Sequence, residues 1–269
     1  MTRTPRFPLA LDRMQPPPRG AAGELLRPQQ PLRQAARDAD RQRPPSGFGL
    51  DSVAVRTRMV ERLRAGGLDN ASVLQAMSTV PRHLFVDTAL ITQAYEDTSL
   101  PIGLGQTISK PSIVGRMLAL LFEGTNARAT GSLGRVLEIG TGCGYKTALL
   151  ALLSTSVISV ERLQSLHDKA QANLDEHRGG RVRLVFGDGM RGHPPNAPYD
   201  SIIAAAGGDE LPPAWLEQLA VGGRLVAPLA DAASGTQVLV VVDREAGGFV
   251  RRVHEAVRFV PLRSGTQGT

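Results

Sequence analysis

The feature that most constrains the fold is the alternation of short β-rich runs with helical stretches from Arg135 onward. Such alternation predicts a doubly wound α/β fold, in which a mainly parallel sheet carries helices on both faces. Ligands of these sheets bind beyond the carboxyl ends of the strands. The strand-like runs are RVLEI, VISV, RVRLVF, SIIAAA, GRLVAPL, TQVLVVVD and FVRRVHEAVRFVPL, and the helical stretches are YKTALLALL, LQSLHDKAQANLDEH and PPAWLEQLA.

Upstream of this region, two stretches predict a small helical subdomain. DSVAVRTRMVERLRAGG has apolar residues at helical spacing and ends on Gly66 and Gly67, where a helix C-cap is expected. DNASVLQAMSTVPRHLF offers Asp69 or Asn70 as the N-cap of a second helix, which we expect to stop before Pro81.

The positive charge of the chain is concentrated in residues 1–48. This segment holds nine arginines, no lysine and four acidic residues, and therefore five of the six net positive charges. It also holds nine of the 19 prolines. A segment of this composition cannot bury enough apolar surface to offset the entropy of ordering. We therefore expect residues 1–48 to form a disordered Arg/Pro-rich tail and residues 49–269 to form the folded domain.

The composition excludes several classes of protein. A chain of 269 residues with 42% hydrophobic residues can bury a large core, but it has no run near the roughly 18 apolar residues that a membrane span needs. The N-terminal apolar patch is broken by Pro8 and Asp12, so we expect no signal peptide. Cys143 is the only cysteine, which indicates a reducing cytoplasm, and the five histidines lack ligand-like spacing. We predict no metal site.

The most distinctive local motif is the glycine loop in VLEIGTGCGYKTALL. Gly140, Gly142 and Gly144 stand between a predicted strand and a predicted helix, where glycines permit a tight turn and a close approach of backbone N–H groups to a ligand. A dinucleotide fingerprint would place its third glycine at position 145, which is Tyr145. The loop therefore disfavours nicotinamide binding, and taken alone it fits a plain strand-to-helix turn equally well.

Two acidic residues follow the next two predicted strands. Glu161 ends VISVE, about 20 residues after the loop, where a carboxylate can bond both hydroxyls of a ribose. Asp188, in GDGM, follows the third strand, where a carboxylate can bond the amino group of an adenine. Each acid alone could instead cap the structure that follows it. The loop and both acids together predict an adenosine site.

This order of motifs resembles the class I S-adenosylmethionine-dependent methyltransferases. The upstream segment GQTISKP further resembles protein-L-isoaspartate O-methyltransferases, whose motif reads Gln-Thr-Ile-Ser-x-Pro. The resemblance covers about residues 51–263 and implies a seven-stranded Rossmann-like sheet with S-adenosyl-L-methionine as cofactor. It also implies that residues 49–132 form the substrate side and residues 133–269 the cofactor-binding core. The further matching pieces are TVPRHLFVD, SVERLQSL, GDG, PYDSIIAAA, LPPAWLEQL, GGRLVAPL and EAVRFVPL.

The resemblance implies methyl transfer to the free α-carboxylate of L-isoaspartyl residues in damaged proteins and peptides, which starts their repair through a succinimide. It assigns Ser109 as the catalytic serine, whose hydroxyl orients the substrate carboxylate. The residues alone favour Ser109 as the N-cap of the helix PSIVGRMLALL. The two roles are compatible, because a helix N-terminus also attracts anions. The implied cofactor-binding residues are Glu138, Gly140, Thr141, Gly142, Gly144, Glu161, Asp188 and Gly189, and the implied substrate contacts are Gln106, Thr107 and Ser112.

Three positions depart from the family pattern, which often has an aromatic residue or histidine at Ser112, threonine at Ala205 and serine at Cys143. They leave peptide preference and catalytic efficiency open. One alternative is a methyltransferase for RNA or a small molecule, but YDSIIAAAGG lacks the Asn-Pro-Pro-Tyr type of acceptor motif.

A second alternative is a protein that binds nucleic acid through its basic tail on an idle fold; the intact glycine loop argues against it. We expect a cytoplasmic monomer that acts on isoaspartyl proteins and peptides. We expect no membrane association, and we confine any contact with nucleic acid to the 1–48 tail.

Overall fold

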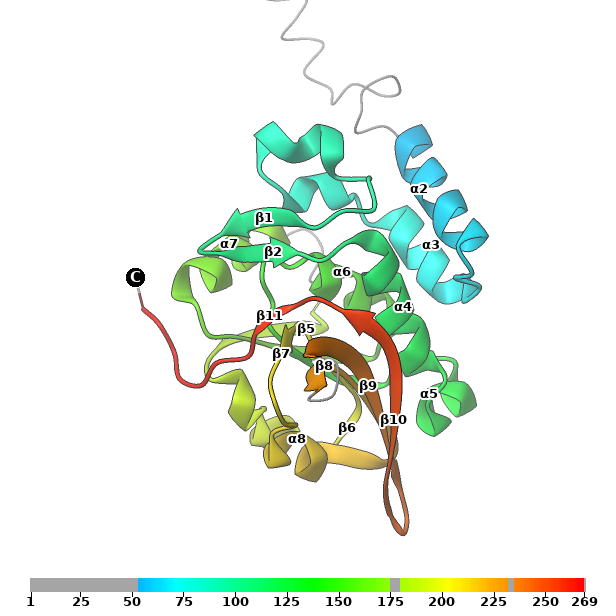
Figure 1. Cartoon of the computed structure of the whole chain (residues 1–269), viewed down its shortest axis with the longest axis vertical. Coiled ribbons are helices and arrows are strands. Elements are labelled where there is room, and N and C mark those ends of the chain that lie inside the picture. Colours follow the sequence, from blue (N-terminus) through cyan, green and yellow to red (C-terminus); the bar gives the residue numbers. More distant parts are fainter. Residues whose placement is uncertain (1–52, 175–179, 232–234, 269) are drawn as a thin grey trace, which may run out of the picture. The chain divides into compact units, whose positions relative to one another are not determined.

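Two hydrophobic cores lie on opposite faces of one central sheet in the computed structural model. The structure describes residues 53–174, 180–231 and 235–268, and Figure 1 shows the arrangement of their helices and strands. Successive strand residues alternate between the cores: Val136 belongs to one and Leu137 to the other, as do Val157 and Ile158. Because neighbouring side chains on a strand point to opposite faces, this pattern buries the sheet on both sides. The predicted 1–48 tail lies outside the described residues.

The sheet has seven strands in the order β10-β9-β8-β6-β3-β4-β5. Five strands are mutually parallel, and β9 and β10 follow β8 as an antiparallel meander. The predicted doubly wound, mainly parallel, seven-stranded sheet is confirmed. The sequence leaves the strand order at the end of the sheet open, and in the structure β8, β9 and β10 lie there in chain order. The strands are β3 (Arg135–Ile139), β4 (Ser156–Glu161), β5 (Val182–Phe186), β6 (Tyr199–Ala204), β8 (Leu219–Asp231), β9 (Thr236–Glu245) and β10 (Gly248–Val257).

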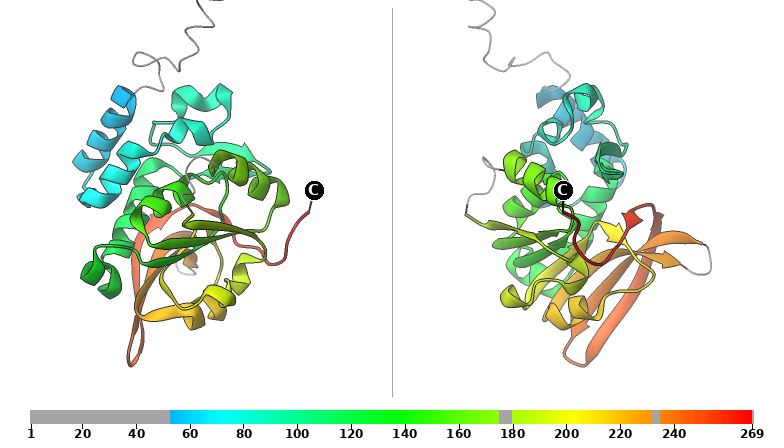
Figure 2. Two further views of the ribbon diagram at one scale, coloured as in Figure 1. Left: turned by 180° about the vertical axis from the view of Figure 1, so that it is seen from behind. Right: turned by 90° about the vertical axis from the view of Figure 1, so that its left-hand side faces the viewer.

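Helices cover both faces of the sheet (Figure 2). Helices α4 and α6 contribute Leu118 and Leu149 to one core, and α8 contributes Trp215 to the other. The end of the helix predicted in LQSLHDKAQANLDEH lies outside the described residues. These elements are α4 (Pro111–Phe122), α5 (Thr125–Thr130), α6 (Tyr145–Leu153), α7 (Gln164–Leu174), η4 (Gly189–Arg191), η5 (Pro194–Asn196) and α8 (Pro213–Gln218).

The two N-terminal helices form where the sequence predicts them. Helix α2 (Val53–Ala65) buries Met59 and Leu63, and α3 (Ala71–Thr79) ends before Pro81. Asn70 is the N-cap of α3, since its side chain accepts a hydrogen bond from the backbone N–H of Val73 at 3.0 Å. Two short 3-10 helices, η2 (Arg82–Phe85) and η3 (Thr88–Gln93), lead on towards the site. In the three described stretches, no helix is long and apolar enough to cross a membrane.

Two small strand pairs lie at the carboxyl ends of the large sheet's parallel strands (Figure 1). One is a hairpin of β1 (Leu100–Gly103) and β2 (Gln106–Ile108), with a turn at Leu104 and Gly105. Both turn residues have positive φ angles, 53° and 69°, as a two-residue hairpin turn of this kind requires. The other joins β7 (Ala206–Gly207) in parallel to β11 (Val260–Pro261). The C-terminal segment is thereby brought over the same edge of the sheet.

Candidate active site

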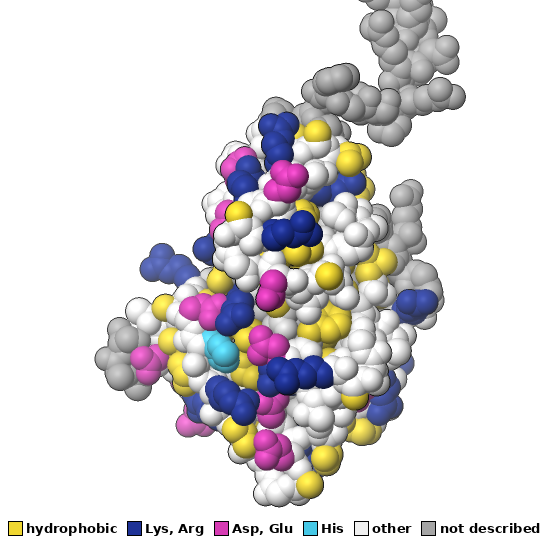
Figure 3. All heavy atoms as spheres, turned by 90° about the vertical axis from the view of Figure 1, so that its right-hand side faces the viewer, with side chains coloured by type: hydrophobic (Ala, Val, Ile, Leu, Met, Phe, Trp, Pro, Cys, Tyr) yellow, Lys and Arg dark blue, Asp and Glu magenta, His cyan; other side chains and the backbone are white. Residues whose placement is uncertain are grey.

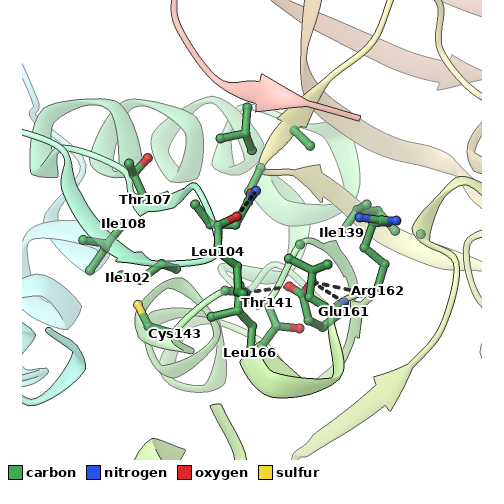
Figure 4. A pocket seen from close by; sticks show the side chains of 18 of the residues that line it. Ile102, Leu104, Thr107, Ile108, Ile139, Thr141, Cys143, Glu161, Arg162 and Leu166 are labelled. Carbon is green, nitrogen blue, oxygen red and sulfur yellow. Dashed lines mark hydrogen bonds between the residues drawn. The ribbon is translucent and has the colours of Figure 1, made fainter. Parts of the chain in front are cut away.

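A cavity of about 400 Å³ opens at the carboxyl ends of β3 and β4. Figure 4 shows Glu161 and Arg162 on one side of it and Ile102, Thr107 and Ile108 of the hairpin region on the other. The cavity is therefore bounded by the cofactor core and by the segment that contains GQTISKP. The predicted site residues that line it are Gln106, Thr107, Ser109, Gly140, Thr141, Gly142, Glu161 and Gly189.

Gly140 and Gly142 form a cofactor cradle, a stretch of backbone beside the cavity that has no room for larger residues. Gly140 and Gly142 have φ angles of 83° and 58°, a region that residues with a Cβ rarely adopt. A Cβ at Gly140 would stand 3.3 Å from Ala205 Cβ, and one at Gly142 would stand 3.2 Å from Ile102 Cδ1. Both glycines line the cavity. Their backbone can therefore approach a ligand closely, which fits the adenosyl and methionyl groups of the expected cofactor.

Glu161 ties this loop to the next strand. Its Oε2 accepts a hydrogen bond from the N–H of Gly142 at 2.9 Å, and its Oε1 accepts from the N–H groups of Arg162 at 2.9 Å and Leu163 at 3.0 Å. The residue is only 5% exposed and lines the cavity. Backbone donors thus hold the carboxyl group of Glu161 at the position where the sequence predicts a ribose contact.

Glu138, which is predicted as a cofactor contact, is not among the residues that line the cavity. It is completely buried, and its Oε2 accepts from Thr147 Oγ1 at 2.6 Å and Ser159 Oγ at 2.7 Å. Burial raises the pKa of Glu138, and the ammonium group of Lys146, 3.6 Å from Oε1, opposes that rise. Ser159 also bonds Thr141 at 2.6 Å. This carboxyl group therefore supports the loop from inside the protein.

Asp188 makes two backbone contacts, and its predicted contact with an adenine stays a prediction. Its Oδ1 accepts from the N–H of Met190 at 2.9 Å and caps η4, while its Oδ2 accepts from the N–H of Gly265 at 2.7 Å. The side chain does not line the cavity, whereas the neighbouring Gly189 does. Asp188 therefore caps η4, and its second oxygen anchors the C-terminal segment. Gly144 is likewise outside the lining and serves as the N-cap residue of α6.

The C-terminal segment is a wall of the cavity that sequence reasoning missed. Arg263 and Gln267 line it, together with β11. Hydrogen bonds hold the segment in place: the N–H of Gln267 donates to Arg162 O at 2.8 Å, and Arg162 Nε donates to Gly265 O at 3.0 Å. The ending RFVPL was visible as a family motif. Its place in the site depends on the pairing of β11 with β7, which no local pattern reveals.

Ser109 faces the cavity and does not cap helix α4. The N-cap position is Lys110, whose side chain makes no capping hydrogen bond. Asp97 caps the helix instead, since its Oδ1 and Oδ2 accept from Ser112 N–H and Ser112 Oγ, each at 2.8 Å. Within the described part of the chain, no hydrogen bond to the Ser109 hydroxyl occurs. The capping interpretation of Ser109 is therefore wrong, and the hydroxyl group is available to a ligand.

Ser112 belongs to a different cavity from the other predicted substrate contacts. It lines a second space of about 910 Å³, together with Arg62 and Arg116. Its side chain is already bonded to Asp97. The structure therefore separates Ser112 from Gln106, which stays with the first cavity.

Charged side chains on the described surface are mixed in sign. Figure 3 shows one face on which basic and acidic groups intermingle. Arg116 and Glu255 form an exposed ion pair of this type at 3.0 Å. This face therefore presents no continuous basic patch within the described residues. Among those residues, no group of three or more His, Cys, Asp or Glu side chains could hold a metal ion.

The fold and this site together define a class I S-adenosylmethionine-dependent methyltransferase. The glycine loop follows the first strand of the parallel sheet, and the acidic residue that holds it ends the second. Residues 54–267 match the family model described as protein-L-isoaspartate(D-aspartate) O-methyltransferase. The chain belongs to this family.

Three similar proteins are named protein-L-isoaspartate O-methyltransferase. Protein-L-isoaspartate O-methyltransferase from Methylibium petroleiphilum is 60% identical over 97% of both chains. The enzyme from Leptothrix cholodnii is 57% identical over 98% of this chain and 95% of its own. The enzyme from Dechloromonas aromatica is 51% identical over 82% of this chain and 99% of its own.

Two solved structures share the fold. One, named protein-L-isoaspartate O-methyltransferase, has a TM-score of 0.68 and 27% identity, and the match covers 79% of this chain and 67% of that one. A Plasmodium falciparum structure named for the same enzyme, in complex with S-adenosyl-L-homocysteine, has a TM-score of 0.66 and 24% identity, and the match covers 77% of this chain and 98% of that one.

Proposed function

We propose that this chain transfers a methyl group from S-adenosyl-L-methionine to the free α-carboxylate of L-isoaspartyl residues in damaged proteins and peptides. Membership of the family supports the reaction. The observation that carries the assignment of roles is that Ser109, uninvolved in capping α4, lines the same cavity as the glycine loop and Glu161. The serine on the acceptor side and the glycine loop on the cofactor side then line one cavity.

The residues on the cofactor side fit the cofactor. The backbone of Gly140 and Gly142 would hold it closely, and Glu161 would accept hydrogen bonds from its ribose hydroxyls. Gly189 and the C-terminal residues Arg263 and Gln267 close the same space. When bound, S-adenosyl-L-methionine supplies a methyl group activated by its attachment to a positively charged sulfur.

The acceptor needs no general base from the protein. A carboxyl group with an ordinary pKa of ~3.9 is already ionised at neutral pH. Carboxylate and sulfonium both lose charge as the reaction proceeds, so a site that excludes water favours the transition state. Ile102, Ile108 and Val114 supply apolar walls for this purpose. No acid–base pair is therefore part of the proposal.

Orientation is the main contribution of the protein. The Ser109 hydroxyl donates a hydrogen bond to one oxygen of the substrate carboxylate and leaves the other free to attack the methyl carbon. Holding the reacting atoms in line at near-attack distance can supply several kcal/mol of the barrier reduction, on the order of 7 or more in favourable cases. Gln106 and Thr107 line the approach to the same point.

Repair follows from the chemistry of the product. The backbone nitrogen that follows the methylated residue attacks the ester carbonyl, methanol leaves, and a succinimide forms. Water then opens the ring and returns part of the material to the normal aspartyl linkage. The enzyme therefore needs to catalyse only the first step.

Some sequence-based expectations remain predictions. These are the division into a 1–48 tail and a 49–269 domain, the monomeric state, the cytoplasmic location and any contact of the tail with nucleic acid. The relatives' common name gives no support to RNA or a small molecule as the acceptor.

The proposed reaction is tested with two peptides that differ only in one linkage, L-isoaspartyl in the first and L-aspartyl in the second. With methyl-labelled cofactor, the full-length chain should label the isoaspartyl peptide and leave its twin unlabelled. Equal labelling of both peptides, or of neither, would contradict the proposal.

A further inference from the structure

Arg82 is a completely buried arginine that contacts both sides of the active site. Its Nη2 donates a hydrogen bond to the backbone oxygen of Ser109 at 2.8 Å, and its Nε donates to the backbone oxygen of Ala94 at 2.8 Å. Its guanidinium carbon lies 4.8 Å from the centre of the Tyr145 ring. Tyr145 lines the cavity and begins α6 directly after the glycine loop. One side chain therefore joins the acceptor side to the cofactor side.

Packing alone does not explain an arginine at this position. Burial lowers the pKa of the Arg82 guanidinium, although arginine remains protonated in proteins at neutral pH. Within the described residues, no ion pair links Arg82 to a carboxylate. Two backbone carbonyl groups and the Tyr145 side chain contact the guanidinium, and the charge of Asp97 compensates it from beyond ion-pair distance. An apolar side chain of similar volume would fill the space without this cost.

The segment that contains Ser109 needs an external restraint. Strand β2 ends at Ile108 and α4 begins at Pro111, so Ser109 belongs to neither element. Its backbone oxygen is held by the hydrogen bond from Arg82. A planar guanidinium donates in two directions at once and can fix two carbonyl groups relative to an aromatic ring, which an ammonium group does less well.

We propose that Arg82 is a positioning residue for methyl transfer, which holds the backbone at Ser109 so that the serine hydroxyl faces the cavity beside the glycine loop. This inference rests on the proposed function of Ser109. Arg82 itself lies outside the cavity lining and acts through Ser109. A misplacement of about 1 Å at a reacting group can cost on the order of a hundredfold in rate. The restraint should therefore affect turnover more than cofactor affinity.

The test is a double-mutant cycle on the full-length chain. Arg82→Lys is made in the wild type and in Ser109→Ala, with Arg82→Gln as a second variant that removes the buried charge. The measurements are kcat and KM with an isoaspartyl peptide, Kd for S-adenosyl-L-homocysteine, and the unfolding temperature. Arg62→Lys is the matched control, because Arg62 Nη2 donates to the backbone oxygen of Tyr95 at 2.7 Å while its side chain is 53% exposed.

In the wild type, Arg82→Lys should lower kcat by about ten- to a hundredfold and change Kd for S-adenosyl-L-homocysteine by less than about twofold. In the Ser109→Ala background, the same substitution should lower kcat by less than about threefold, because the hydroxyl group that it positions is gone. Arg62→Lys should leave kcat unchanged.

Equal losses of kcat in the two backgrounds would overturn the proposal, as would an unchanged kcat in Arg82→Lys. Failure of both Arg82 variants to fold would assign the residue to the fold and would also overturn it. A wild-type enzyme that does not methylate the isoaspartyl peptide would contradict the proposed function itself. If the wild type is active and the free-energy effects of the Arg82 and Ser109 substitutions on kcat simply add, only the role of Arg82 is contradicted.

Discussion

Asp97 caps helix α4 through Ser112, with one carboxylate oxygen on the backbone N–H and the other on the hydroxyl group, each at 2.8 Å. These two residues are fifteen positions apart. The contact satisfies an N–H group that the helix itself leaves without a partner. It also explains why Ser109, which directly precedes the Lys110 N-cap, is not needed at the helix terminus.

Gly142→Ala should weaken cofactor binding. Its φ of 58° costs about 1 to 2 kcal/mol for a residue with a Cβ, and the new methyl group would stand 3.2 Å from Ile102 Cδ1. Gly131→Ala is the matched control, since Gly131 has a φ of 66° with open space around its Cβ position. Both variants should lose similar stability in urea unfolding. By calorimetric titration, only Gly142→Ala should lose affinity for S-adenosyl-L-homocysteine. Equal affinities in the two variants would contradict cofactor binding by the glycine loop.

Glu161→Gln should also weaken cofactor binding, because it places an amide where three backbone N–H groups need acceptors. A hydrogen bond to a charged group contributes about 1.5 to 3 kcal/mol. Loss of one such bond between the Glu161 carboxylate and the ligand should therefore raise Kd for S-adenosyl-L-homocysteine at least about tenfold. Asp168→Asn, on the exposed side of α7, serves as the control and should leave Kd unchanged. An unaltered Kd in Glu161→Gln would remove this carboxylate from the site.

Asp243 should make the stability of the sheet depend on pH in acid. Burial alone would raise the pKa of Asp243, but hydrogen bonds and charges from Arg224 and Arg252 outweigh burial and lower it. Arg224 Nε and Nη2 donate to the carboxylate at 2.6 and 2.9 Å. A lowered pKa stabilises the folded state above the unfolded-state pKa of ~3.9, and this stability is lost as the pH falls through the folded-state pKa.

Asp243→Asn tests that dependence. The difference in unfolding free energy between wild type and variant, measured in urea, should be full at pH 7 and should shrink progressively below about pH 4. A difference that is constant from pH 7 to pH 3 would show that the ionisation of Asp243 does not contribute.

The central sheet could be predicted from the sequence because its signals are local. YKTALLALL corresponds to α6, since the apolar run starts directly after a glycine that ends the loop. The β1–β2 hairpin was missed, because its strands span only four and three residues and one contains Pro101. Short strands carry too little alternation for a period of two to be recognised.

The site was only partly predictable, because several of its contacts join distant parts of the chain. The Gly140–Gly142 cradle and Glu161 follow from motif spacing. The hydrogen bond from the N–H of Gly265 to Asp188 depends on how the C-terminal segment lies over the sheet, and no pattern near Asp188 indicates it. Glu138 stands in the motif, yet its side chain points to Thr147 and Ser159 inside the protein.

Ser109→Ala and Ser112→Ala together test the central claim most directly, since the two serines flank the same helix start. Ser109→Ala should lower kcat for an isoaspartyl peptide by at least about tenfold, with unfolding stability and Kd for S-adenosyl-L-homocysteine unchanged. Ser112→Ala loses a bond to the capping carboxylate, so it should lose about 1 kcal/mol of stability and keep its kcat. The reverse pattern, with kcat intact in Ser109→Ala and stability lost there, would show that Ser109 serves the helix and not the reaction.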